Sequence, residues 1–77
     1  MNRLKELRQE KKLSQKELAE NIGVHYRTLQ NWENGESQIK PEKAQQLADY
    51  FGVSVGYLLG YSEYRDSQEA SYQLYRN

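Results

Sequence analysis

Four glycines divide the first 60 residues of this chain into short segments, and their spacing limits what the chain can fold into. Gly23, Gly35, Gly52 and Gly60 each follow a run in which apolar side chains recur every three or four residues. That period is typical of amphipathic α-helices, and glycine is a usual helix stop because it adopts the left-handed conformation without strain. No segment alternates apolar and polar residues as a strand would. The spacing therefore predicts a series of short helices.

The segment "SQKELAENIG" carries start and stop signals for one such helix. Ser14 is followed three residues later by Glu17, which is the spacing of a capping box, where each side chain binds the backbone N–H of the other residue. Leu18, Ala19 and Ile22 share one face, which we expect to be buried. This helix is therefore bounded by identifiable chemistry at both ends.

The remaining helices follow the same logic. A first helix is expected around Leu4 and Leu7, and a fourth begins at Pro41, whose missing N–H costs nothing at the first helical position. Ser54 is a candidate N-cap for a short fifth helix. The apolar residues expected to face the core in the last two helices are Ala44, Leu47, Ala48, Phe51, Val55, Leu58 and Leu59.

The composition of the 77 residues limits the chain to one small domain and excludes several classes of protein. There is no cysteine, so neither a disulfide framework nor a thiolate zinc site is available, and the single histidine, His25, cannot hold a metal alone. No apolar run approaches the roughly 20 residues that span a bilayer, and the N-terminal segment lacks the apolar core of a secretory signal. We expect a cytoplasmic protein without a metal, a cofactor or a membrane anchor.

The formal net charge is zero, so overall charge gives no indication of a nucleic-acid partner. The charges are nevertheless uneven: residues 1–40 carry eight Lys or Arg and six Asp or Glu, whereas residues 41–77 carry three and five. A solvated charged surface is enough to explain this weak asymmetry. Any partner has to be inferred from individual residues.

The segment "GVHYRTLQNWENG" predicts a third helix with an unusual polar face. At about 100° per residue, Trp32 lies about 60° from Leu29, so these two side chains share the face expected in the core. Arg27 and Asn31 lie about 160° and about 200° from Leu29, on the opposite face, and Gln30 lies at its edge. Amide and guanidinium groups of this kind can bind base edges in the major groove of DNA.

Two short helices joined by a glycine-containing turn form a helix-turn-helix pattern, and here the local sequence is more specific than the pattern alone. "LKELRQEKKLSQKELAENIGVHYRTLQNWENGE" resembles the phage repressor and Cro family of helix-turn-helix domains, and "KPEKAQQLADYFGVSVGYLLG" resembles the closing two helices of that family. The characteristic pieces are "SQKELA", a glycine and a valine at the turn, and "WENG", in that order and spacing. The resemblance implies an all-α fold, a compact five-helix bundle of the lambda-repressor-like DNA-binding type.

The resemblance, which covers about residues 2–60, also implies the domain organisation. Residues 1–60 are expected to form the helix-turn-helix DNA-binding domain, and residues 61–77 a C-terminal extension or linker that is loose or partly helical. The last residues, "YQLYRN", include no terminating element, which leaves open whether the chain is the DNA-binding half of a longer repressor.

Most candidate DNA-binding residues lie in the second and third helices. The resemblance implies that Gln15 contacts a phosphate and braces the third helix, and an amide at a helix N-terminus can donate to a phosphate oxygen. Arg27 can donate two hydrogen bonds to guanine, or hold a phosphate without reading sequence. Asn31 and Gln30 can pair with adenine or hold a phosphate, and Asn31 points further outward. Tyr26 can contact a thymine methyl group or reach a phosphate through its hydroxyl.

Two further candidates depart from the family pattern. His25 occupies the N-cap position where the family usually has serine or threonine, so we expect a doubtful cap that is free to touch the DNA backbone or a base. Lys40 stands at the start of the fourth helix, where the resemblance implies an approach to the DNA backbone and where the usual capping hydroxyl is missing. It either contacts a phosphate or is simply solvated.

Other residues are expected to be structural. The family commonly pairs an arginine of the first helix with the glutamate after the aromatic residue of the third, and Arg8 and Glu33 match that pattern. The resemblance therefore implies a buried ion pair. Trp32 is expected in the core rather than in a stacking site, because it lies beside Leu29 on the helical wheel. We find no paired carboxylates, nucleophile with a base, or phosphate-binding glycine loop, so we expect no enzyme activity.

The family binds as a two-fold dimer on near-palindromic DNA, and the resemblance implies the same for this chain. We expect the dimer surface near "SVGYLLGYSEY", where Tyr57 and Tyr61 stand one turn apart beside an apolar helix. Aromatic residues are favoured at the centres of interfaces. The alternative is that both tyrosines only cover the edge of the domain.

Together these features predict a sequence-specific DNA-binding transcriptional regulator. The preferred interpretation is a phage or prophage-type repressor that binds a near-palindromic operator through its third helix, with no evident small-molecule ligand. Two alternatives stay open: an antitoxin or restriction-system controller with the same domain, and a protein-interaction module that keeps the fold without reading DNA. The absence of acidic side chains from His25 to Trp32 argues against the second alternative.

Overall fold

The computed structural model describes residues 2–65, and that part of the chain contains five α-helices and no strand. The helices are α1 (Leu4–Glu10), α2 (Gln15–Ile22), α3 (Tyr26–Asn34), α4 (Pro41–Phe51) and α5 (Val55–Leu59). The prediction of an all-α five-helix bundle is confirmed. Residues 66–77, which make up most of the expected C-terminal extension, lie outside the described residues.

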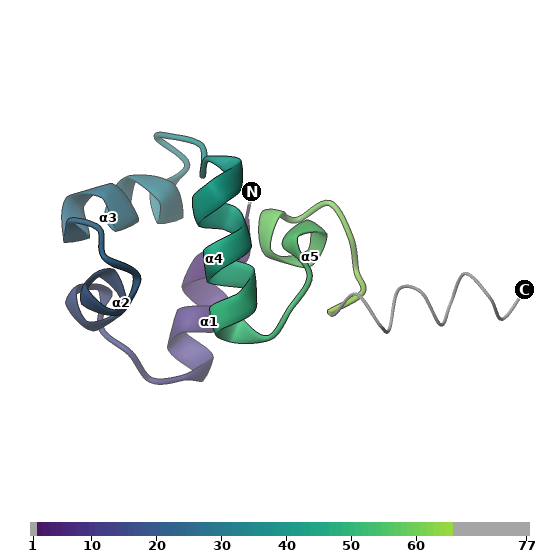
Figure 1. Ribbon diagram of the computed structural model, residues 1–77, viewed down its shortest axis with the longest axis horizontal. Helices are drawn as coiled ribbons and strands as arrows, with labels where there is room; N and C mark the ends of the chain where they lie inside the picture. The colour runs from purple at the N-terminus through teal and green to yellow at the C-terminus, as the bar shows by residue number, and fades with distance from the viewer. Residues whose placement is uncertain (1, 66–77) are drawn as a thin grey trace, which may run out of the picture.

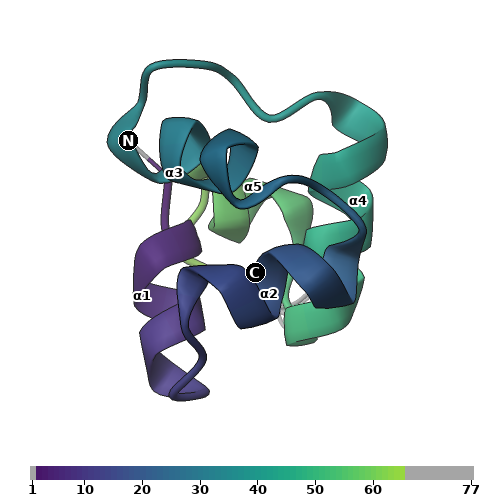
Figure 2. The same cartoon turned by 90° about the vertical axis from the view of Figure 1, so that its left-hand side faces the viewer.

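α4 runs through the centre of the domain, with α1 behind it in the view of Figure 1. α2 and α3 pack against each other on one side of α4, and α5 packs against α4 on the opposite side. Figure 2 turns the α2–α3 side toward the viewer and shows that only a short turn joins these two helices. The α2–turn–α3 pair thus packs on one side of the domain formed with α1, α4 and α5.

Local chemistry determines where α2 begins and ends. The Ser14 hydroxyl accepts a hydrogen bond from the Glu17 backbone N–H at 3.0 Å, and the Glu17 carboxylate accepts one from the Ser14 backbone N–H at 2.8 Å. The predicted capping box is therefore confirmed. Gly23 follows α2 with a φ of 82°, the left-handed conformation that makes glycine favourable at this position.

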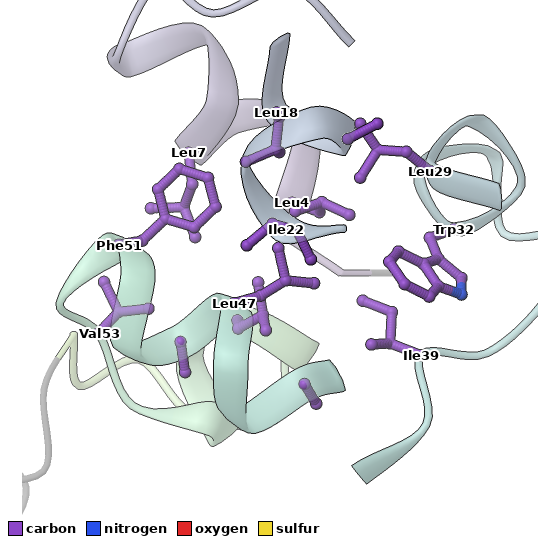
Figure 3. Packing of buried hydrophobic residues seen from close by; sticks show 14 residues of the cluster. Leu4, Leu7, Leu18, Ile22, Leu29, Trp32, Ile39, Leu47, Phe51 and Val53 are labelled. Carbon is purple, nitrogen blue, oxygen red and sulfur yellow. The ribbon is translucent and has the colours of Figure 1, made fainter. Parts of the chain in front are cut away.

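A single hydrophobic cluster fills the space between the helices (Figure 3). Figure 3 shows Leu29 and Trp32 of α3 directed into this cluster, together with Leu18 and Ile22 of α2. The residues of α2 and α4 that were expected to face the core are all buried. The core therefore fixes the rotation of α3, and with it the direction of its polar face.

Helical periodicity predicted burial less well at the edges of the core. In α5 only Leu58 is fully buried, whereas Val55 and Leu59 are partly buried, because this five-residue helix lies at the end of the bundle. Ile39 and Val53 are buried although they lie in connections between helices. A helical period cannot identify core residues of this kind.

Residues 61–65 turn back onto the helical domain. The Ser54 backbone N–H donates to the Arg65 carbonyl oxygen, and the Ser54 hydroxyl donates to the Tyr64 carbonyl oxygen at 3.0 Å. The Arg65 guanidinium forms an exposed ion pair with Glu10 of α1, at 2.7 Å between nitrogen and oxygen. These contacts attach the segment that follows α5 to both α5 and α1.

The capping box gives the domain a pH-dependent element. Hydrogen bonds from the Ser14 backbone N–H and hydroxyl lower the pKa of Glu17 below its usual value of 4.5. A carboxylate whose pKa is lower in the folded state stabilises the fold above its unfolded pKa, and this stabilisation is lost as the pH falls through the folded value. Glu17→Gln should therefore show a smaller loss of melting temperature than the unmutated chain between about pH 7 and about pH 3.

Thermal melts at the two pH values test this prediction. Glu20→Gln, which changes an exposed carboxylate of the same helix, serves as the control and should keep the pH dependence of the unmutated chain. If the melting temperatures of Glu17→Gln and Glu20→Gln fall by the same amount on acidification, the capping box does not contribute to the pH dependence.

Candidate nucleic-acid interface

The helical wheel predicted the two faces of α3, and burial agrees with it. Leu29 and Trp32 are buried, which confirms the expectation that Trp32 belongs to the core. Arg27 is exposed, while Gln30 and Asn31 are partly buried on the solvent side of the helix. α3 therefore packs one side against the core and presents a guanidinium and two amides to solvent on the other side.

His25 caps α3, so the expectation that it is a doubtful cap is wrong. Its Nδ1 atom accepts a hydrogen bond from the Arg27 backbone N–H at 3.1 Å. An imidazole nitrogen in the acceptor state can replace the usual hydroxyl oxygen, because the cap only has to satisfy a free backbone donor. With Nδ1 as acceptor, the proton of the neutral ring lies on Nε2, which is left as a donor.

Tyr26, the first residue of α3, lies between side chains of two elements. Its ring stacks on the ring of His25, with 4.9 Å between the ring centroids. The Lys16 ammonium of α2 lies 5.5 Å from the Tyr26 ring centroid, within the range of a cation–π contact. Lys16 is a candidate contact that sequence reasoning missed, although it directly follows Gln15 at the start of α2.

A buried ion pair joins α1 to α3. The Arg8 Nε atom lies 2.6 Å from Glu33 Oε2, and Arg8 Nη2 donates to Glu33 Oε1 at 3.1 Å. The two side chains are only 11% and 1% exposed. A third Arg8 nitrogen donates to the Leu13 carbonyl oxygen at 2.8 Å, so the guanidinium is bound on three atoms. The structure thus brings together the two residues that the family pattern pairs.

Gln15 links this ion pair to the polar side of α3. Its Nε2 atom donates to Glu33 Oε1 at 3.1 Å, and its Oε1 atom accepts from Gln30 Nε2 at 3.0 Å. Gln15 is the first residue of α2, so these bonds join the start of α2 to the middle and the end of α3. The angle between the two helices is therefore held by polar contacts as well as by the core.

Lys40 is placed by the loop between α3 and α4. It is the N-cap residue of α4, its side chain is exposed, and it makes no capping hydrogen bond. Pro41 follows as the first helical residue, as predicted. Figure 1 shows this end of α4 on the same side of the domain as the end of α3.

The two candidate tyrosines of the dimer surface have different surroundings. The guanidinium of Arg3 lies 4.1 Å from the Tyr57 ring centroid, and that of Arg65 lies 5.4 Å from it. Tyr57 is therefore engaged within the chain. Tyr61, in contrast, is 84% exposed, and it lines a hollow of about 310 Å³ together with Leu59 and residues of the α3–α4 loop.

Comparison with protein families matches residues 4–58 to the family described as Helix-turn-helix. The chain belongs to the phage repressor and Cro-type helix-turn-helix family. In this domain, α2 and α3 are the two helices of the helix-turn-helix motif, and the turn lies between Ile22 and Tyr26. The family is one of DNA-binding regulators rather than of enzymes.

One curated relative gives a more specific comparison. The helix-turn-helix domain is 36% identical over 62 residues to the cryptic phage CTXphi transcriptional repressor RstR of Vibrio cholerae. The match covers 80% of this chain but only 56% of the relative, so the chain spans little more than half the length of that repressor. No solved structure matches the chain. Among residues 2–65, none of the helices has the length and apolar character needed to cross a membrane.

Proposed function

We propose that this domain is the operator-binding unit of a phage-type transcriptional repressor, and that α3 enters the major groove of DNA. The observation that carries this proposal is the polar face of α3, held in one orientation by the core and by the Arg8–Glu33–Gln15–Gln30 contacts. Similarity to a phage repressor supports it. Two copies on neighbouring major grooves would repress by blocking access of the polymerase.

The candidate residues divide into readers of bases and contacts to the DNA backbone. Arg27 and Asn31, on the outward side of α3, are proposed to contact base edges. Gln15, at the start of α2, and Lys40, before α4, are proposed to bind phosphates, which position the domain without reading sequence. Lys16 joins this second group because its ammonium lies beside the tip of α3.

His25 and Tyr26 complete the proposed surface at the N-terminal tip of α3. The Nε2–H of neutral His25 is available to a phosphate or to a base acceptor, because Nδ1 is occupied by the cap. The Tyr26 ring lies between the His25 ring and the Lys16 ammonium, and its hydroxyl is proposed to reach a phosphate. Neither residue competes with Arg27 for the same helical face.

Selection from a library of random DNA duplexes tests the proposed function. We expect enrichment of a near-palindromic sequence whose half-sites lie about 10–10.5 base pairs apart, centre to centre, because a two-fold dimer places its third helices one helical turn apart. Recovery of no preferred sequence would reject the proposal and would favour a protein-interaction module with the same fold.

The proposed dimer surface includes Tyr57 and Tyr61, and the exposed Tyr61 is the better residue to test. Since Tyr57 is engaged with Arg3 and Arg65, its replacement would disturb the domain as well as any interface. We expect the unmutated chain to fill a full palindrome cooperatively. Tyr61→Asp should remove this cooperativity and leave the affinity for an isolated half-site unchanged, because a buried carboxylate opposite its two-fold copy is unfavourable.

Binding curves on full-site and half-site duplexes measure both quantities. Tyr61→Phe is the matched control, because it keeps the aromatic ring at the same position and adds no charge, and it should retain the cooperativity. Independent filling of the two half-sites by the unmutated chain would show that no dimer contact forms on DNA.

A further inference from the structure

The cap that begins α3 depends on an atom that can gain a proton in mild acid. His25 Nδ1 accepts the Arg27 backbone N–H at 3.1 Å, and only an unprotonated ring nitrogen can accept a hydrogen bond. Histidine changes its charge between about pH 5 and about pH 8, whereas the hydroxyl of a serine or threonine cap does not. His25 is exposed, and it is the only histidine in the chain, so it is open to solvent protons.

Protonation turns this cap into a repulsive contact. An imidazolium donates from both ring nitrogens, so its Nδ1–H would face the Arg27 N–H at a helix end that already carries partial positive charge. The ring therefore has to leave the cap, and the Arg27 N–H loses its acceptor. Because the His25 ring also stacks on Tyr26, with 4.9 Å between the centroids, the same movement removes one neighbour of the Tyr26 ring.

The charged groups around the ring favour protonation when DNA is bound. Lys16 and Glu20 of α2 line the hollow beside His25, and Tyr26 and Arg27 adjoin the ring on α3. Since the tyrosine is uncharged near neutral pH, these groups carry two positive charges and one negative charge, which gives an imidazolium little support in the free domain. A phosphate beside the ring would supply the missing negative charge.

We propose that His25 is a proton-sensitive positioning residue, which makes sequence discrimination by α3 weaker in mild acid than at neutral pH. The neutral ring caps the first turn of α3, which carries Tyr26 and Arg27. The charged ring gives up the cap and gains attraction for phosphates, which all sequences share. This inference concerns regulation of the proposed DNA site, and it rests on the proposed function because it requires that α3 reads bases.

Two duplexes test the proposal, one with the motif that selection enriches and one with the same bases in scrambled order. The ratio of their dissociation constants should fall about fivefold between about pH 8 and about pH 5.5, the factor that corresponds to one lost N-cap. The reason is that base contacts need an ordered first turn, whereas phosphate contacts do not. Binding to the scrambled duplex should tighten over the same range, because the imidazolium attracts phosphates.

Two variants separate the cap from the charge. Asparagine is a favoured N-cap that does not titrate, so His25→Asn should keep the high discrimination of the unmutated chain at both pH values. His25→Ala has neither a cap nor a charge, so its discrimination should be low at both. If His25→Ala discriminates as well as the unmutated chain at about pH 8, the cap does not support sequence reading. If His25→Asn discriminates as poorly as His25→Ala, the ring itself contacts a base, and the positioning role is rejected.

NMR spectra of the isotope-labelled full chain without DNA test the cap independently of the proposed function. At about pH 8 the neutral ring should carry its proton on Nε2, and the Arg27 amide resonance should shift with the ring resonances on acidification. A proton on Nδ1 of the neutral ring would overturn the cap.

Failure of this inference is distinguishable from failure of the proposed function. If selection enriches no sequence, both are rejected. If a motif is enriched but its advantage over the scrambled duplex does not change with pH, only the role of His25 is rejected. Melting curves at both pH values establish that each measurement was made on folded protein.

Discussion

Glu33→Ala is expected to lower the free energy of unfolding by about 3–5 kcal/mol, because it would leave the Arg8 guanidinium buried without its counter-charge. The Glu33 side chain is 1% exposed and accepts hydrogen bonds from both Arg8 and Gln15, so water cannot simply replace it. In a domain of this size such a loss corresponds to a fall in melting temperature of at least about 12 °C.

Two comparisons make this prediction specific. Glu36→Ala removes an exposed carboxylate three residues later and should change stability by less than about 0.5 kcal/mol. Replacing both partners together, with Arg8→Met and Glu33→Leu, should recover much of the loss, because no stranded charge remains. Equal melting temperatures for Glu33→Ala and Glu36→Ala would contradict a stabilising role for the ion pair.

The second large effect concerns sequence reading by α3. Arg27→Ala should remove about 1–3 kcal/mol of preference at one base pair, because a bidentate contact to guanine would be lost. Lys40→Ala should instead weaken binding to all sequences alike and reduce the slope of affinity against salt by about one ion. Arg27 is exposed and Lys40 makes no capping bond, so neither variant should disturb the fold.

Selection of preferred duplexes by the two variants measures this difference. A changed base preference at one symmetric position is expected for Arg27→Ala and an unchanged motif for Lys40→Ala. If Arg27→Ala retains the complete motif and only binds more weakly, Arg27 holds a phosphate rather than a base.

The parts of the fold that could be predicted from the sequence are those that depend on neighbouring residues. The Ser14–Glu17 capping box and the glycine stop at Gly23 act within one turn of helix, so their spacing alone is informative. The burial of Leu29 and Trp32 follows from helical periodicity in the same way. Each of these features can be predicted from residues within a single helix and its caps, without knowing how the helices pack.

The features that could not be predicted depend on how the helices cross. The Gln15–Gln30 hydrogen bond and the contact of Lys16 with the Tyr26 ring require the observed packing of α2 on α3. The spacing of Tyr57 led to its prediction at the dimer surface, but it gave no sign that the guanidinium of Arg3, which precedes α1, lies against the Tyr57 ring. Periodicity within one helix contains no information about such contacts.

The capping role of His25 was missed for a different reason. Residue preferences at N-caps favour small oxygen-bearing side chains, and they describe what is common rather than what is chemically possible. The His25 imidazole supplies the same acceptor to the Arg27 backbone N–H. Listing the free backbone donors at the start of α3 and the side-chain acceptors near them would have identified His25 as the cap.

The measurement that tests sequence-specific DNA binding most directly is a pair of dissociation constants at physiological salt. One duplex carries the motif enriched by selection, and the other carries the same bases in scrambled order. The unmutated chain should bind the first at least about 10³-fold more tightly, the lower end of the range for specific DNA-binding proteins. Equal dissociation constants for the two duplexes would contradict the proposal that α3 reads an operator.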